Sequence, residues 1–304
     1  MLERLRQVAF LVRDLEDAKE LYRRYLGMET CHTEDLSHYG LNNAVLPAGN
    51  GTFIELLQPT AADSSAARYL ERRGETPYML IFETREFDRL IPHLKSMDVR
   101  LSEEPVNGDY RHAFIHPSSA NGALLEIIEV TGGSNPWPAA GPDWQSLQQR
   151  PMTKQLRQMA VLVRDLDDAV NRWENMFGIT ATKRFQVSFT DLEIAVLPVG
   201  GKDTFIELAQ PTGSDVPSAR FLERYGEGIY LTIYEIDDSL AMDEYLKGQE
   251  ARYTSSRVTS NYVNLGFNSI WLHPAGMKGV FTQLSQVLAE DNPWPPAGDT
   301  WHLE

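Results

Sequence analysis

Three polar side chains interrupt apolar runs that have the composition of β-strands: Gln7, Glu55 and Glu126. Removing a polar group from water costs free energy unless the group is hydrogen-bonded, so each of these residues needs a partner or a function. A carboxyl group in partly apolar surroundings has a raised pKa, and two such groups can divide the roles of acid and base. If the fold brings Glu55 and Glu126 to one cavity, they are candidates for proton transfer next to a carbonyl group.

One histidine, His112, lies on a predicted sheet strand and is the best further candidate for a base near neutral pH. Side chains alternate between the two faces of a strand, so His112 shares a face with Phe114, and Gln7 shares a face with Ala9 and Leu11. Alternation alone does not determine whether His112 faces the same cavity as the carboxylates.

The chain contains one sequence plan twice. LRQVAFLVRDLEDA from Leu5 returns as LRQMAVLVRDLDDA from Leu156, 151 positions later. SNPWPAAGPDW from Ser134 returns as DNPWPPAGDTW from Asp291, 157 positions later. The offset changes little, so insertions are few, and this period is far longer than the roughly 20 to 50 residues of a solenoid repeat. The pattern indicates duplication of a whole domain.

The length of 304 residues fits two domains of about 150 residues, each large enough to bury its own core. The polar segment from Gln145 has the composition of a linker. We place the boundary near Pro151, with a first unit at residues 1–150 and a second at 151–304, each ending in an NPWP tail.

Within each half the pattern predicts alternating strands and helices. Val8 to Val12 is a β-branched and aromatic strand run, and Asp14 begins a helix that ends at Gly27. The later elements of the first half are helices at 66–73 and 87–97 and strands at 43–46, 52–57, 78–83, 112–115 and 123–128. Each half is thus predicted to contain two β-α-β-β(-β) modules, which is an α+β architecture.

The phrases IELLQPT, SAARYLERRGE, SEEP, FIHP and GALLEIIE, in this order, resemble the vicinal oxygen chelate superfamily, most closely its glyoxalase and methylmalonyl-CoA epimerase-like branch. The resemblance implies the glyoxalase/bleomycin resistance/dioxygenase fold, in which paired modules form a cupped mixed sheet around a metal. The usual ligands are His, Glu or Gln, His and Glu, on four strands. The two halves are then expected to pack as a pseudo-dimer, and a homodimer of the whole chain stays open.

At the four ligand positions that the resemblance implies, the first half has Gln7, Glu55, Met79 and Glu126, and the second has Gln158, Glu207, Leu231 and Gln283. Neither half keeps an imidazole, the ligand that favours zinc, nickel or iron. The oxygen set Gln7, Glu55 and Glu126 would hold a hard divalent cation or manganese only weakly, so we favour no cofactor over a cation in the first half. The iron of extradiol dioxygenases needs two His and one Glu in the second half, which excludes that chemistry.

The remaining residues at these positions are expected to contact the ligand: Gln7 and Met79 in the first half, and Gln158, Glu207 and Gln283 in the second. The segment HTEDLSHYGLNN contains His38 and Tyr39 and is expected to lie over the mouth of the first cup. FQVSFTDLE replaces it in the second half, so the two cups should bind different ligands.

Several aromatic residues are predicted to be structural. Tyr78 and Tyr230 precede the third ligand position, and alternation turns them away from the cup, which predicts a core role. The tryptophans of the NPWP tails, which bury a large area each, are predicted to clamp their domains or the boundary between them: Trp137, Trp144, Trp294 and Trp301.

Three functions remain open. The leading hypothesis is an isomerase, epimerase or lyase acting on a small carbonyl-containing or aromatic metabolite. In it Glu126 and Glu55 act as acid and base, His112 is a spare base, and Gln7 is a hydrogen-bond donor or weak metal ligand. The second is a protein of the drug-resistance type that sequesters a small molecule without chemistry. The third is a structural module whose cups are filled by side chains.

The composition narrows the partners and the location. A net charge of −15 opposes binding to nucleic acid and to anionic membranes, and no apolar run approaches the roughly 18 residues of a membrane span. Cys31 is the single cysteine, so the chain cannot form an internal disulfide, and the N-terminus lacks the pattern of a signal peptide. We therefore expect a cytoplasmic protein with a small-molecule ligand.

Overall fold

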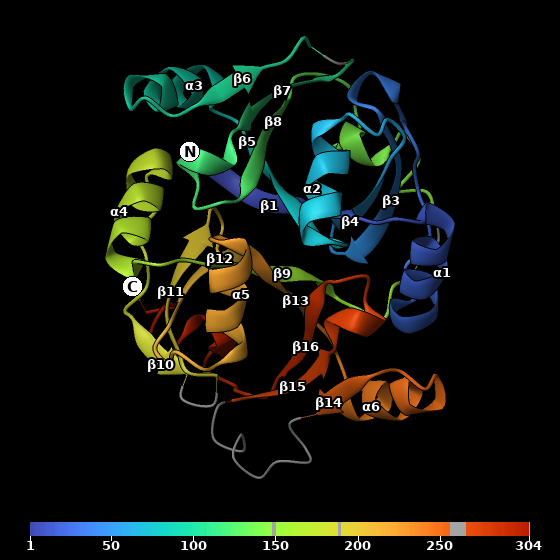
Figure 1. Cartoon of the computed structure of the whole chain (residues 1–304), viewed down its shortest axis with the longest axis vertical. Helices are drawn as coiled ribbons and strands as arrows, with labels where there is room; N and C mark the ends of the chain where they lie inside the picture. The colour runs from blue at the N-terminus through green and yellow to red at the C-terminus, as the bar shows by residue number, and fades with distance from the viewer. Residues whose placement is uncertain (107, 148–149, 188–189, 256–265, 304) are drawn as a thin grey trace.

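The computed structural model describes residues 1–106, 108–147, 150–187, 190–255 and 266–303. Each half of the chain folds into one curled mixed sheet with helices, and Figure 1 shows the first half above and the second half below. In both halves the described strands follow one order, β2-β3-β4-β1-β5-β8-β7-β6 in the first and β10-β11-β12-β9-β13-β16-β15-β14 in the second. The predicted tandem of two α+β units is confirmed.

The first sheet contains β1 (Leu2–Leu11), β2 (Asp35–Leu36), β3 (Leu41–Gly49), β4 (Thr52–Pro59), β5 (Thr76–Thr84), β6 (Leu101–Glu103), β7 (Tyr110–Ile115) and β8 (Leu124–Val130). Its helices are α1 (Leu15–Leu26), α2 (Ser65–Arg73) and α3 (Phe87–Ser96). The second sheet contains β9 (Gln155–Leu162), β10 (Phe185–Val187), β11 (Leu192–Val199), β12 (Thr204–Pro211), β13 (Gly228–Glu235), β14 (Tyr253–Ser255), β15 (Phe267–Leu272) and β16 (Phe281–Val287). Its helices are α4 (Leu166–Phe177), α5 (Pro217–Tyr225) and α6 (Ser239–Gly248).

The local signals of the sequence act as expected. Asp14 accepts a hydrogen bond from the backbone N–H of Asp17 and so caps α1, which ends at Gly27 with φ of +64°. In each module the first strand pairs in parallel with the last strand, as β1 does with β4 and β5 does with β8. An antiparallel pair, β1 with β5, joins the two modules at the centre of the sheet.

The two faces of each sheet have different surroundings. On the first sheet Gln7, Ala9 and Leu11 turn toward the concave side, while Val8 and Phe10 turn toward a core that both units share. That shared core also contains residues of β9, so the convex faces of the two sheets are buried against the same hydrophobic layer. Each concave face is left to line its own cup.

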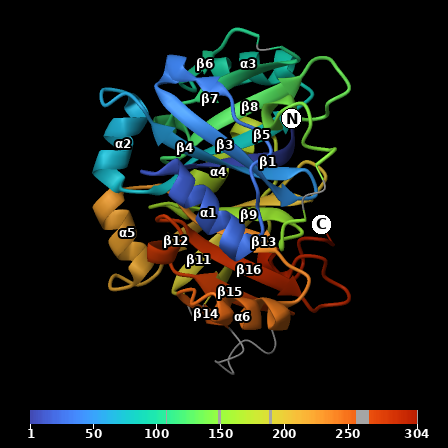
Figure 2. The same ribbon diagram turned by 90° about the vertical axis from the view of Figure 1, so that its right-hand side faces the viewer.

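Each unit makes equivalent contacts with the other, as expected for approximate two-fold symmetry. The backbone N–H of Leu5 donates to Thr204 Oγ1 at 2.9 Å, and its counterpart Leu156 donates to Thr52 Oγ1 at 2.8 Å. α4 packs beside α3 of the other unit, as Figure 1 shows, and residues of α1 contact the end of α6. In Figure 2, α1 lies in front, at the boundary between the two units. The expected pseudo-dimer packing is therefore present.

Two glycines permit this close packing. A Cβ on Gly49 would lie 2.1 Å from the carbonyl oxygen of Lys154, and one on its counterpart Gly200 would lie 2.0 Å from that of Glu3. Both glycines also have positive φ, which disfavours any larger residue.

No helix among the described residues is both long and apolar enough to cross a membrane.

Candidate functional site

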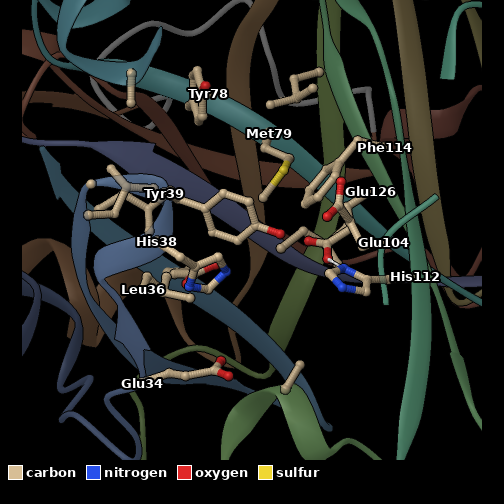
Figure 3. A pocket seen from close by; sticks show the side chains of 18 of the residues that line it. Glu34, Leu36, His38, Tyr39, Tyr78, Met79, Glu104, His112, Phe114 and Glu126 are labelled. Atoms are coloured by element: carbon tan, nitrogen blue, oxygen red, sulfur yellow. Dashed lines mark hydrogen bonds and ion pairs between the residues drawn. The ribbon is translucent and has the colours of Figure 1, made fainter. Parts of the chain in front are cut away.

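The first unit encloses a cavity of about 970 Å³ on the concave side of its sheet. β1, β4, β5, β7 and β8 contribute its floor and walls, and the short segment that contains the 3-10 helix Ser37–Tyr39 lies at its mouth. The lining contains all of the residues proposed for this cup, namely Gln7, His38, Tyr39, Glu55, Met79, His112 and Glu126. Figure 3 shows how several of these side chains converge.

A hydrogen-bonded chain explains the interrupting glutamine. Trp137 of the NPWP tail donates from Nε1 to Gln7 Oε1 at 3.1 Å, and Gln7 Nε2 donates to Glu55 Oε2 at 3.0 Å. Asn43 Nδ2 donates to the other oxygen of Glu55 at 2.7 Å. Trp137 is fully buried, so the tail does clamp its own domain, and it also fixes the orientation of the glutamine.

Glu55 is a buried carboxyl group with only 7% of its surface exposed. Burial raises the pKa of Glu55 to about 7, against the opposing effect of the Asn43 and Gln7 hydrogen bonds, and the charge of Glu126 raises it further. Near neutral pH this group therefore exists in both its protonated and its ionised form.

His112 and Glu126 form a second buried pair, 8% and 7% exposed respectively. They lie on neighbouring strands, and His112 Nδ1 donates to Glu126 Oε1 at 2.7 Å. Burial lowers the pKa of His112, but the hydrogen bond and the negative charge of Glu126 outweigh it, so the net shift is upward. The open question about the strand face is thus answered, since His112 does reach the cup.

Aromatic rings surround this pair. Phe114 and Tyr110 make edge contacts with His112, with ring centroids 5.4 and 5.5 Å apart. Tyr39 at the mouth packs edge-on against Phe114 and hydrogen-bonds Glu104. Burial, with the nearby carboxylates, raises the pKa of Tyr39 to about 12, so its hydroxyl stays protonated.

The prediction that Tyr78 and Tyr230 point away from the cup is wrong, because both side chains line a cup, although both also pack against a hydrophobic cluster. Along β5, Met79 pairs with Ala9 while Pro77 pairs with Phe10, so Tyr78 is the extra residue of a β-bulge. The same irregularity occurs at Tyr230. A bulge breaks strict alternation, which turns two successive side chains toward the same side.

The side chains at the four ligand positions of the first cup are not arranged to bind a metal ion. The oxygen of Gln7 accepts from Trp137, and both oxygens of Glu55 accept from amide groups. Glu126 is bound to His112, and Met79 occupies the remaining ligand position. Within the described residues no group of three or more His, Cys, Asp or Glu side chains could hold a metal. A hard cation needs several free oxygen ligands, and here hydrogen bonds already engage the oxygen of Gln7, both oxygens of Glu55 and Oε1 of Glu126.

The second unit has a cup of about 720 Å³ that repeats part of the arrangement. Trp294 donates to Gln158 at 2.7 Å, and Gln158 donates to Glu207 at 2.6 Å. Burial raises the pKa of Glu207 to about 7, opposed by the Gln158 hydrogen bond. Leu231 lines this cup as well.

At the remaining positions the second cup differs. Gln283 replaces Glu126 and donates to the hydroxyls of Ser269 and Ser285 at 3.0 and 2.9 Å. Trp271 donates to the oxygen of Gln283 at 3.1 Å. The segment FQVSFTDLE contributes Phe185 and further described residues to the lining, while its positions 188–189 lie outside the described residues. The His112–Glu126 pair of the first cup thus has no equivalent here, whereas Glu207 corresponds to Glu55.

The sequence analysis did not single out three polar residues: Glu34 and Glu104, which line the first cup, and Asn43, which donates to Glu55. Asn43 follows Asn42 at the start of the predicted strand 43–46, so it interrupts no apolar run. Glu34 belongs to the segment HTEDLSHYGLNN that was expected at the mouth, whereas Glu104 follows β6 and only the fold brings it to the cavity.

Comparisons with known proteins agree with this architecture. The model of the Glyoxalase/Bleomycin resistance protein/Dioxygenase superfamily matches residues 6–115 and 157–264. Methylmalonyl-CoA epimerase of Bos taurus is 33% identical over 133 residues, which are 42% of this chain and 75% of that protein. The ethylmalonyl-CoA/methylmalonyl-CoA epimerase of Cereibacter sphaeroides is 33% identical over 135 residues, 43% of this chain and all of that protein.

Among solved structures, a mutant of 4-hydroxymandelate synthase from Streptomyces coelicolor superposes with a TM-score of 0.74 at 15% identity. The match covers 97% of this chain and 95% of that one, so it shows that both units share that two-unit fold. Together with the family match over both halves, this means that the chain belongs to the glyoxalase/bleomycin resistance protein/dioxygenase superfamily.

Proposed function

We propose that the first cup catalyses proton transfer next to a carbonyl group of a small molecule, as an isomerase or epimerase does. The observation that carries the proposal is the buried His112–Glu126 pair on the wall of a ligand-sized cavity. A base must lie within reach of the proton that it removes, and both side chains face the space that a substrate would fill. The names of the epimerase relatives denote the same reaction type.

The carboxyl groups would divide the work. Glu126 accepts the proton from carbon and later gives it up to the intermediate or to solvent, while His112, whose Nδ1–H donates to Glu126, orients and stabilises the carboxylate. Glu55 has a pKa of about 7 and in its protonated form donates a hydrogen bond to the developing oxyanion. Gln7 and Asn43 hold Glu55 in position, so Gln7 acts as a positioning residue in this scheme. A lyase is the alternative outcome where a leaving group departs from the same intermediate.

Hydrogen exchange with solvent tests the proposal without knowledge of the natural substrate. The protein is incubated in D₂O with small ketones, aldehydes and thioesters, and loss of the C–H signal next to the carbonyl is followed by ¹H NMR. We expect exchange above the buffer rate for compounds that fit the cup, reduced by about 10²-fold or more in Glu126→Gln. Glu207→Gln is the matched control, because Glu207 is equally buried but lies in the other cup.

Exchange that survives in Glu126→Gln, or that falls equally in Glu207→Gln, would contradict the assignment. Absence of exchange with all compounds would favour the second candidate, a protein that sequesters its ligand. One observation favours that candidate, since none of the described residues lining the first cup is a Lys or Arg that would stabilise an oxyanion. In that case Glu126→Gln would leave ligand affinity nearly unchanged.

A further inference from the structure

The first cup has a strongly one-sided charge. Its described lining contains six carboxyl groups and no Lys or Arg; the six are Glu34, Asp35, Glu55, Asp63, Glu104 and Glu126. The histidines of the lining are His38 and His112, and His112 is bound to Glu126. A cavity with low-dielectric walls concentrates the field of such charges, so it attracts cations and repels anions.

Aromatic rings accompany the carboxyl groups. Tyr39, Tyr78, Tyr110 and Phe114 all line the cavity, and Figure 3 shows Tyr39 and Phe114 near the carboxylates of Glu104 and Glu126. The face of an aromatic ring attracts a positive charge, most strongly when the cation is removed from water. Carboxylates and ring faces together are the surroundings that an organic ammonium group prefers.

The second cup shows that this charge belongs to the first unit and not to the fold. Strand pairing aligns Asp35 with Gln186 and Glu126 with Gln283, so two of the acidic positions carry neutral amides there. The described lining of the second cup contains both signs of charge, Lys183 and Arg184 beside Asp191, Glu207 and Asp299. The one-sided negative charge is therefore a property of the first cup.

The epimerase relatives are named for CoA esters, which carry several negative phosphate charges. Binding of such groups needs Lys or Arg side chains, and the lining of the first cup offers none among the described residues. We propose that the first cup accepts a small organic cation, a molecule with a protonated or quaternary nitrogen beside an apolar group, and rejects carboxylates and phosphate esters. This inference deepens the proposed function by naming the substrate class of the same site.

Three probes of nearly equal size and different charge test the inference: 2-phenylethylammonium, 2-phenylethanol and phenylacetate. Isothermal titration of the full chain at low ionic strength should give the tightest binding for the cation, at least about 10-fold tighter than for phenylacetate. The double variant Glu34→Gln/Glu104→Gln should weaken the cation by about 5-fold to 10-fold and leave the alcohol unchanged. Raising the salt concentration to 0.5 M should weaken cation binding in the wild type through screening.

Glu103→Gln is the matched control, because Glu103 lies next to Glu104, pairs with Lys95 outside the cavity, and is absent from its lining. Equal or tighter binding of phenylacetate, an unchanged cation affinity in the double variant, or no cation binding at 10 mM would each overturn the inference. The result is independent of catalysis. Cation binding without solvent exchange would refute the proton-transfer proposal alone, and exchange with preference for the anion would refute the charge inference alone.

Discussion

The two cups share a scaffold and differ in the groups that can move protons. In both, a buried tail tryptophan donates to a glutamine, and the glutamine donates to a buried glutamate whose pKa is raised to about 7. Because this arrangement occurs twice, it reflects how the fold satisfies a polar group inside its sheet, and it does not by itself indicate catalysis.

The two cups differ on β7 and β8 of the first sheet and on the corresponding strands β15 and β16 of the second. His112 and Glu126 of the first cup correspond to Ser269 and Gln283 of the second, where hydroxyl and amide groups hydrogen-bond each other and cannot exchange a proton near neutral pH. A duplicated fold therefore offers an internal control. Each substitution in the first cup can be compared with its counterpart in the second.

The largest expected effect is on the free energy of unfolding, and it concerns the buried tail tryptophan that both cups share. Trp137→Ala and Trp294→Ala each remove a fully buried indole that also donates to a glutamine. Each should lower the free energy of unfolding by about 3–5 kcal/mol. Guanidinium denaturation followed by fluorescence and circular dichroism measures this loss. A cost below about 1 kcal/mol for either variant would mean that its tail is not part of the domain core.

The dependence of stability on pH should appear in both cups. The pKa of Glu207 in the folded chain is about 7, above its ordinary value of 4.5, so the folded state binds this proton more tightly than the unfolded state. The resulting stabilisation is present below pH 4.5 and is lost as the pH rises through 7, a difference of about 3 kcal/mol. Relative to wild type, Glu207→Gln should therefore gain stability between pH 5 and pH 8. A difference that does not change with pH would contradict the raised pKa.

A swap between counterparts should affect activity in one cup only. His112→Ser introduces the residue type of the second cup and removes the partner of Glu126. The rate of solvent exchange should fall by about 10-fold to 10²-fold and its pH profile should change, because Glu126 loses the donor that orients and stabilises its carboxylate. Ser269→Ala in the second cup is the comparison and should leave the exchange rate unchanged. Equal losses in the two variants would mean that the effect is structural.

A smaller effect is expected on the pKa of Glu55. Asn43→Ile introduces the residue found at the corresponding position, Ile194, and removes one of the two amide donors to Glu55. Loss of a hydrogen bond to the ionised form should raise the pKa of Glu55 further, by about one unit. Titration of the Glu55 carboxyl carbon by NMR measures the shift. A pKa that stays the same or falls would show that burial alone sets its value.

Metal analysis separates the two remaining interpretations of Gln7. We expect less than about 0.1 equivalent of any divalent ion in protein purified without chelator, because hydrogen bonds already occupy the oxygens of Gln7 and Glu55. Near-stoichiometric metal that is absent from Glu126→Gln would instead support a ligand set and would contradict the engaged-donor argument.

Local patterns determined much of the fold. The cap at Asp14, the stop at Gly27 and the strand runs depend on neighbouring residues, so the sequence placed them within a few positions. The short edge strands β2 and β6 were missed, because two or three residues carry no periodic signal. The boundary near Pro151 stays a prediction.

For the site, the sequence by itself identified Gln7, Glu55 and Glu126, because a polar residue in an apolar strand is visible without coordinates. Only the tertiary structure decided what each one contacts. Trp137 lies 130 positions from Gln7, and the bulge at Tyr78 depends on pairing between β1 and β5. Such contacts depend on which strands become neighbours, and that arises from packing of the whole sheet and not from local preference.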